Sequence, residues 1–256
     1  MTTRTQGSLV ASAFRLNAVQ GIIDRRILVN FRCDPKPLGR LLPAPFRPGL
    51  VRGFGIAGVC LIRLRDIRPT GLPSWLGVAS ENAAHRVAVE WDENGEVKEG
   101  VFIPRRDSDS ILNAIAGDRL FPGHHHRATF RVVETDQAFN VEMKSADGSV
   151  SLDVSAVVAE RPSAGSVFET LEDASDFFQR GALGWSTRRD QRGFDGLKLS
   201  CTEWHMVPLA VERVQSSFFS NIANFPPGAA EFDSAFLMRS VPHEWHARGV
   251  MDGRFL

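Results

Sequence analysis

The dipeptide Asn94-Gly95 separates two apolar runs, 86–91 and 97–103, and this arrangement constrains the fold more than any other sequence feature. Asn and Gly both tolerate the positive φ angles of a two-residue hairpin turn, so the two runs are predicted to pair as antiparallel strands. Asp147-Gly148 marks a second turn of this kind between apolar runs at 139–143 and 150–158. Hairpins are therefore predicted to be the main building blocks of the chain.

Short apolar runs bounded by turn residues recur elsewhere and predict further strands. These runs lie at 27–31, 50–64, 128–134, 197–206, 209–219 and 232–238. Short helices are predicted after Asp34-Pro35 as far as Leu42, after a Ser108 cap as far as Gly117, and after a Thr170/Asp173 capping box as far as Gly181. This pattern favours a mainly β (α+β) fold, an antiparallel barrel or sandwich with a few short helices.

Composition and charge narrow the range of functions. The 256 residues include 30 basic and 30 acidic side chains, so no strong field attracts the protein to nucleic acid or to a membrane surface. The three cysteines lack a CxxC pair, which argues against a disulfide framework and favours a cytoplasmic location. We expect a loose leader over 1–15 and a single domain over 16–256, with no spanning segment.

Two arginine pairs are candidate ligand-binding residues. Arg25-Arg26 precedes an apolar strand, and such a pair is either a solvated strand end or a fork that holds a carboxylate. Arg105-Arg106 follows Pro104, which ends strand pairing, so these side chains and Asp107 could turn into a barrel mouth. The alternative is a salt-bridged loop in which Asp107 neutralises an arginine.

A third cluster, 81–86, combines an acid, an amide, an imidazole and a guanidinium in one loop-to-strand transition. Glu81 and His85 could move protons near neutral pH, which makes them the candidate catalytic residues, and Arg86 is a further candidate for ligand binding. The competing interpretation is that sequence neighbours point in different directions.

The histidines form a fourth cluster. His124 and His126 would share one face of a strand, and His243 and His246 lie near the C-terminus. No HExxH motif, second HxH motif or carboxylate-rich loop accompanies them, so we predict neither a metal nor any other cofactor and interpret the histidines as capping and hydrogen-bonding residues. Nucleotide-binding glycine motifs and the GxSxG motif are likewise missing from the sequence.

Several segments together resemble the acetoacetate decarboxylase-like superfamily. The opening 24–35, followed by Leu38-x-x-Leu41-Leu42-Pro43, looks like the start of its members. The segments 55–60, 80–86 and 242–246 are more similar to its DUF2071 branch. The resemblance covers roughly residues 22–246 and implies a β-barrel with a central pocket.

The resemblance implies the chemistry of the decarboxylases proper, in which a pocket lysine forms a Schiff base with a β-keto acid. A second lysine lowers the pKa of the first. An early arginine and a strand glutamate hold the substrate. Arg25 falls at the early arginine, whereas Arg105-Arg106 occupies the place of the lysine pair and Arg86 lies near that of the glutamate. Because a guanidinium cannot form an imine, the lysine mechanism does not transfer.

The sequence therefore predicts a small anionic or carbonyl metabolite as the partner, bound in an arginine-lined pocket where Arg25, Arg105 and Arg106 converge. An enzyme of this kind would be a lyase or isomerase acting on a small keto or carboxylic acid. The alternatives are a non-catalytic binding module and, less favoured, a histidine-based metalloprotein. Neither nucleic acid nor membrane is expected as a partner, and a homo-oligomer remains open.

Overall fold

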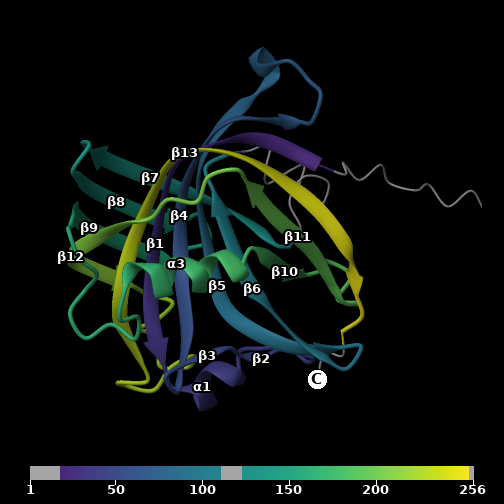
Figure 1. Ribbon diagram of the computed structural model, residues 1–256, viewed down its shortest axis with the longest axis vertical. Coiled ribbons are helices and arrows are strands. Elements are labelled where there is room, and N and C mark those ends of the chain that lie inside the picture. Colours follow the sequence, from purple (N-terminus) through teal and green to yellow (C-terminus); the bar gives the residue numbers. More distant parts are fainter. Residues whose placement is uncertain (1–17, 111–122, 254–256) are drawn as a thin grey trace, which may run out of the picture.

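A computed structural model describes residues 18–110 and 123–253 of the chain (Figure 1). The expected leader over 1–15 and the body of the helix expected after Ser108 lie outside the described residues. Within them the chain is mostly strand, with two α-helices and one 3-10 turn. The strands are β1 (Ala18–Cys33), β2 (Arg47–Pro48), β3 (Leu50–Val51), β4 (Phe54–Pro69), β5 (Val78–Glu93), β6 (Glu96–Ser108), β7 (His125–Glu134), β8 (Ala138–Ser145), β9 (Ser151–Val158), β10 (Leu183–Thr187), β11 (Phe194–Cys201), β12 (Val207–Ser216) and β13 (Ala230–Met251).

The predicted hairpin between β5 and β6 is confirmed. Asn94 and Gly95 have φ angles of 53° and 82°, the conformation of a type I′ turn, and the strands pair in antiparallel register. The hairpin is longer than the apolar runs predicted, because away from the turn residues 82–85 of β5 go on to pair with residues 105–108 of β6.

The strands form two barrel-like rings that share β13, β1, β4, β5 and β6. One ring is completed by β10 and β11, and the other by β7, β8, β9 and β12, which lie on opposite sides in Figure 1. Most pairs are antiparallel, as predicted, but β6 pairs in parallel with both β7 and β10. The mainly β prediction is thus confirmed, with barrel-like rings in place of one regular barrel.

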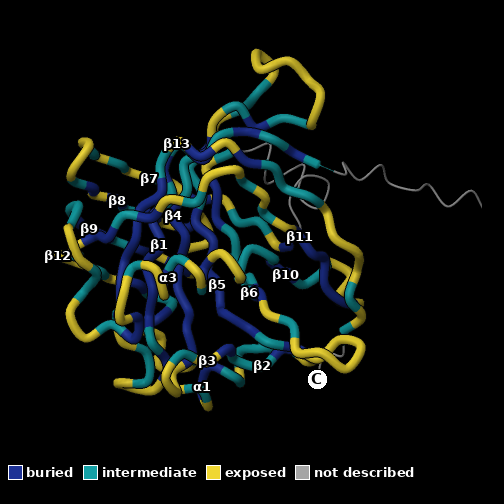
Figure 2. Tube along the Cα trace, in the orientation of Figure 1, coloured by how far each residue is buried: buried dark blue, intermediate teal, exposed yellow. Residues whose placement is uncertain are grey.

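The shared strands are buried on both faces, as the dark segments at the centre of Figure 2 show. Ile27, Val29 and Leu61 point into the ring of β7, β8, β9 and β12, which we call the core side. Leu28 and Cys60 point into the ring of β10 and β11, which we call the cavity side. Successive side chains of a strand alternate between these two interiors.

Two helices cap the shared strands. Helix α1 (Pro35–Gly39) begins after Asp34, whose Oδ1 accepts a hydrogen bond from the Lys36 amide at 2.9 Å. Helix α3 (Leu171–Arg180) carries the predicted capping box, since Thr170 and Asp173 each accept a hydrogen bond from the other's backbone amide. Its Phe178 packs 6.0 Å from the ring of Phe236 on β13, which fixes α3 across the cavity side.

Thr170→Ala removes one half of this capping box and should lower the free energy of unfolding by about 1 kcal/mol, the usual value of an N-cap side chain. Urea denaturation followed by tryptophan fluorescence measures the change. The control is Thr202→Ala at an exposed bend, which should leave the midpoint unchanged. Equal losses in both variants would show that the box contributes nothing.

Candidate functional site

A cavity of about 110 Å³ lies between the shared strands and β10, β11 on the cavity side. Because one water molecule needs only about 10–15 Å³ of such space, the cavity has room for a small organic anion. Apolar side chains of β1, β4, β6 and β11 form most of its wall. The residues with polar side chains in its lining are Arg26, Cys60, Asn82, Arg86, Arg106, Asp107 and His125.

Strand register brings the polar lining residues together. Leu28 of β1 lies opposite Cys60 of β4, which lies opposite Ala84 of β5, which in turn lies opposite Arg106 of β6. Arg26 and Arg86 are two residues from Leu28 and Ala84, so they occupy the same face. The small side chain at Ala84 leaves the space between Cys60 and Arg106 open.

Arg86 is 4% exposed, and its contacts are unusual for a buried guanidinium. Its Nε donates to Cys60 Sγ at 3.1 Å, and another nitrogen donates to the amide oxygen of Asn30. The guanidinium carbon lies 4.8 Å from the ring centre of Phe178. Among the described residues its Nη1 has no hydrogen-bond partner and no carboxylate contacts it. Burial lowers the pKa of Arg86, and the Arg26 charge adds to this shift, whereas Cys60 opposes it.

Arg26 and Arg106 extend this positive surface. Arg26 donates to Cys60 Sγ at 3.7 Å and to Met238 Sδ at 4.0 Å, and it lies 5.7 Å from the ring centre of Trp204. Arg106 donates to the hydroxyl of Ser186 at 3.3 Å. Burial lowers the pKa of Arg106 to about 10, so its guanidinium is still protonated near neutral pH.

Cys60 lies between two of these arginines and is buried. Burial by itself raises the pKa of its thiol, but the charges and hydrogen bonds of Arg86 and Arg26 outweigh burial, so the net pKa is lowered. The other described cysteines behave differently, because burial raises the pKa of Cys33 to about 12 and also raises that of Cys201. Cys60 is thus the described cysteine whose surroundings favour a thiolate.

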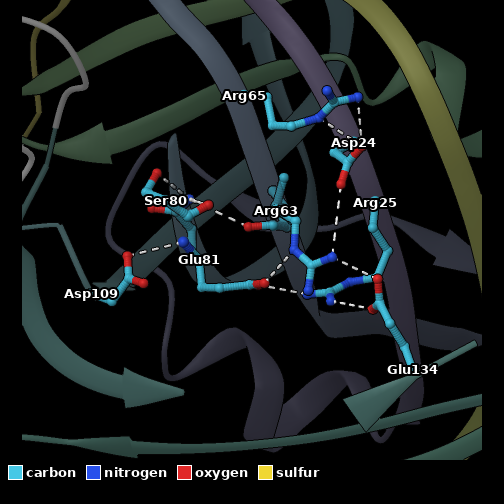
Figure 3. Close-up of polar contacts among 10 residues, drawn as sticks. Asp24, Arg25, Arg63, Arg65, Ser80, Glu81, Asp109 and Glu134 are labelled. Carbon is cyan, nitrogen blue, oxygen red and sulfur yellow. Dashed lines mark hydrogen bonds and ion pairs between the residues drawn. The ribbon is translucent and has the colours of Figure 1, made fainter. Parts of the chain in front are cut away.

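Arg25 lies on the core side and belongs to a closed network of two arginines and two glutamates (Figure 3). It donates to Glu81 and to Glu134 at 2.6 Å each, and Arg63 donates to the same two carboxylates at 2.6 Å each. Arg25 is 1% exposed, so this pairing compensates a charge that would otherwise be costly to bury. Glu81 is held by two guanidiniums and lies outside the cavity lining.

Arg105 and His85 also lie outside the cavity lining. Arg105 forms a two-pronged pair with Asp107, both bonds measuring 2.8 Å, and contacts Asp147 at 3.3 Å. The ring of His85 lies 4.7 Å from that of Phe218, and its two nitrogens have no hydrogen-bond partner among the described residues. Burial, with a smaller contribution from the Arg105 charge, lowers the pKa of His85 to about 3, so the ring is neutral at pH 7.

The expected convergence of Arg25, Arg105 and Arg106 on one cavity is therefore wrong. Arg106 lines the cavity, whereas Arg25 and Arg105 lie outside its lining and pair with carboxylates. Alternation along β1 separates Arg25 from Arg26, and on β6 an irregularity in the pairing with β5, between His85 and Val87, places Arg106 rather than Arg105 in the lining with Val101 and Ile103. Arg86 and Asp107 do contribute to the lining, although the carboxylate of Asp107 is bonded to Arg105.

The histidines singled out in the sequence do not gather. His126 contacts Asp147 at 3.1 Å, and His246 contacts Glu244 at 3.2 Å. His243 is buried 4.1 Å from the ring of Trp245, and burial lowers its pKa to about 4. In the described part of the chain, no group of three His, Cys, Asp or Glu side chains is placed to hold a metal ion. His124 is exposed.

Sequence reasoning gave Arg26 and His125 no role of their own at the pocket and passed over Cys60 and Asn82 as site residues. The alternation of side chains along a strand could have found three of them. Counting in steps of two from Arg86 along β5 reaches Asn82. The same rule separates Arg26 from Arg25, and His125 from its neighbours. Cys60 could not be found this way, because its position beside Arg26 and Arg86 depends on how β4 pairs in register with β1 and β5.

No protein-family model and no curated protein sequence matches this chain significantly. Solved structures do match it. An acetoacetate decarboxylase from Legionella pneumophila superposes with a TM-score of 0.59 at 12% identity, covering 99% of both chains. An acetoacetate decarboxylase-like enzyme from Sphingomonas wittichii gives 0.54 at 14% identity, covering 93% of this chain and 92% of the other.

A third match is the enduracididine biosynthesis enzyme MppR in complex with pyruvate, with a TM-score of 0.58 at 12% identity, covering 94% of this chain and 92% of the other. The chain therefore has the acetoacetate decarboxylase-like fold, as the sequence resemblance implied. At these identities the likeness establishes the fold alone. Among the described residues, no helix has the length and apolar character needed to cross a membrane.

Glu134→Ala should lower the free energy of unfolding by about 3 kcal/mol, because it leaves the buried guanidinium of Arg25 with an incomplete set of partners. The matched control is Glu142→Ala, which removes an exposed pair with Arg131 and should cost less than about 1 kcal/mol. Urea denaturation curves of the two variants measure the difference. If both variants lose the same stability, the network is not a structural anchor.

Proposed function

We propose that this protein binds a small carboxylate or carbonyl metabolite in the cavity lined by Arg26, Arg86 and Arg106. The observation that carries the proposal is the pair Arg26 and Arg86: both guanidiniums line the cavity, and neither contacts a carboxylate within the described residues. Even with Cys60 as a thiolate between them, the two guanidiniums keep one positive charge in excess, which fits an anion that supplies the missing hydrogen bonds.

The chemistry of the lining limits the ligand. The polar groups gather near β4, β5 and β6, while Ile23, Leu197 and Leu199 supply an apolar wall. A short aliphatic acid presents a charged end to the arginines and a carbon chain to this wall, so it fits better than inorganic phosphate. Pyruvate is the natural probe, because a structural neighbour, MppR, is described in complex with it.

We further propose that the protein is a DUF2071-type member of the acetoacetate decarboxylase-like superfamily, and that it acts in the cytoplasm without Schiff-base chemistry. The DUF2071 assignment is supported by segments such as 55–60 and 80–86, which build the cavity side of β4 and β5. The cytoplasmic location is supported by the three free cysteines. The chain's four lysines, Lys36, Lys98, Lys144 and Lys198, are outside the cavity lining.

A second candidate is an enzyme of the lyase or isomerase class acting at the same cavity. It is favoured by two titratable side chains in the lining, Cys60 and His125, beside guanidiniums that could stabilise an enolate-like oxygen. Glu81 and His85 are not used in this version, because they lie outside the lining. Binding of pyruvate without exchange of its methyl protons for deuterium would favour a non-catalytic binding module instead.

Arg86→Met should weaken pyruvate binding by about 2 kcal/mol, roughly 30-fold in Kd, because it removes a charge-assisted bond within a buried site. Isothermal titration calorimetry measures the affinities, and circular dichroism verifies that the variant is folded. The control Arg131→Met removes the same charge from an exposed position and should leave Kd unchanged. Equal affinities of the wild type and Arg86→Met would contradict the proposed site.

Borohydride treatment in the presence of acetoacetate should leave the mass of the intact protein unchanged. The physical reason is that an imine needs an unprotonated amine inside the cavity, and the four lysines lie elsewhere. Intact-protein mass spectrometry is the measurement, with an authentic acetoacetate decarboxylase as the positive control. A stable adduct on Lys98 or another lysine would overturn the exclusion of Schiff-base chemistry.

A further inference from the structure

Cys60 is a nucleophilic side chain inside the cavity. Its sulfur accepts hydrogen bonds from Arg86 Nε at 3.1 Å and from Arg26 at 3.7 Å. Two guanidiniums on one thiol are unnecessary for packing, since a small apolar side chain would fill the same place without burying charge. They are the surroundings that stabilise a thiolate.

A second, independent observation points to a ligand at this thiol. The side chain of Arg86 is buried, lines the same cavity and has a nitrogen, Nη1, with no hydrogen-bond partner among the described residues. An anion bound against the Arg86 guanidinium would supply the acceptor that this nitrogen lacks. The thiol and the unpartnered donor belong to side chains in direct contact, so a ligand held by Arg86 lies next to the sulfur of Cys60.

We propose that Cys60 adds as a thiolate to the carbonyl carbon of a small 2-oxo acid whose carboxylate is held by Arg86 and its neighbouring arginines. The sulfur lone pair forms the new C–S bond, and the π electrons of the carbonyl move onto its oxygen. That oxygen takes a proton from water, which replaces the proton lost by the thiol to solvent. The product is a hemithioketal, and its formation needs neither oxidant nor cofactor.

Arg106 is positioned to assist this addition. It lies across Ala84 from Cys60 and lines the same cavity. Negative charge develops on the carbonyl oxygen during the attack, and a protonated guanidinium nearby stabilises that charge. The inference rests on the proposed function, since it names the ligand class of the same site, but it assigns that site a covalent step that binding alone does not require.

Carbon-13 NMR of pyruvate labelled at its carbonyl carbon tests the addition directly. With wild-type protein in excess, the signal should move from the ketone region to that of a tetrahedral carbon bearing sulfur and oxygen. With Cys60→Ser it should stay in the ketone region while calorimetry still detects pyruvate binding. A ketone signal with wild-type protein at saturation would overturn the covalent step and leave the proposed binding function standing.

Alkylation by iodoacetate and iodoacetamide gives a second readout that does not depend on the hemithioketal equilibrium. Iodoacetate carries a carboxylate, so the arginines should hold it beside Cys60, whereas iodoacetamide is neutral. The ratio of the two rates, measured by peptide mass spectrometry, should be about tenfold higher at Cys60 than at Cys201, equivalent to about 1.4 kcal/mol.

Arg86→Met should reduce this ratio at Cys60, and Arg131→Met should leave it unchanged. Pyruvate should protect Cys60 and not Cys201. A ratio at Cys60 equal to that at Cys201, or alkylation of Cys201 with none at Cys60, would overturn the assignment of Cys60 as the nucleophile. If neither the wild type nor Cys60→Ser binds pyruvate, the proposed function itself is wrong.

Discussion

Alternation along five shared strands is the constraint on which the rest of this structure depends. Because β13, β1, β4, β5 and β6 belong to both rings, the residues in their buried central parts face one interior or the other. Arg25 and Arg26 are neighbours in sequence, yet one is tied to Glu81 and Glu134 on the core side while the other reaches Cys60 on the cavity side. The same division separates Arg105 from Arg106.

The two sides treat buried charge in opposite ways. On the core side, Arg25 pairs with the carboxylates of Glu81 and Glu134, which compensates the burial of its charge. On the cavity side, Arg86 contacts a thiol, an amide oxygen and an aromatic ring, none of which carries a full compensating charge when the thiol is protonated. Charge left uncompensated by the fold is available to a ligand, which is the physical basis of the proposed binding site.

Much of the fold could be predicted from the sequence, because turns and caps act locally. The Asn94-Gly95 hairpin and the Thr170/Asp173 capping box are examples. β10 (Leu183–Thr187) was missed because it is short, and the full length of β13 (Ala230–Met251) was missed because its second half is polar and contains Pro242. The candidate site was predicted only in part: Arg86 and Arg106 were identified, but the place of Cys60 beside Arg86 depends on register between strands distant in sequence.

A crystal structure of the protein with bound pyruvate tests the central claim most directly, because it shows which of the two sides receives the anion. The account predicts a carboxylate hydrogen-bonded to Arg86 in the cavity, with Arg26 and Arg106 in its surroundings and the pair of Arg25 with Glu81 intact. Pyruvate bound to Arg25 or Arg105 on the core side, with the cavity empty at saturating concentration, would contradict it.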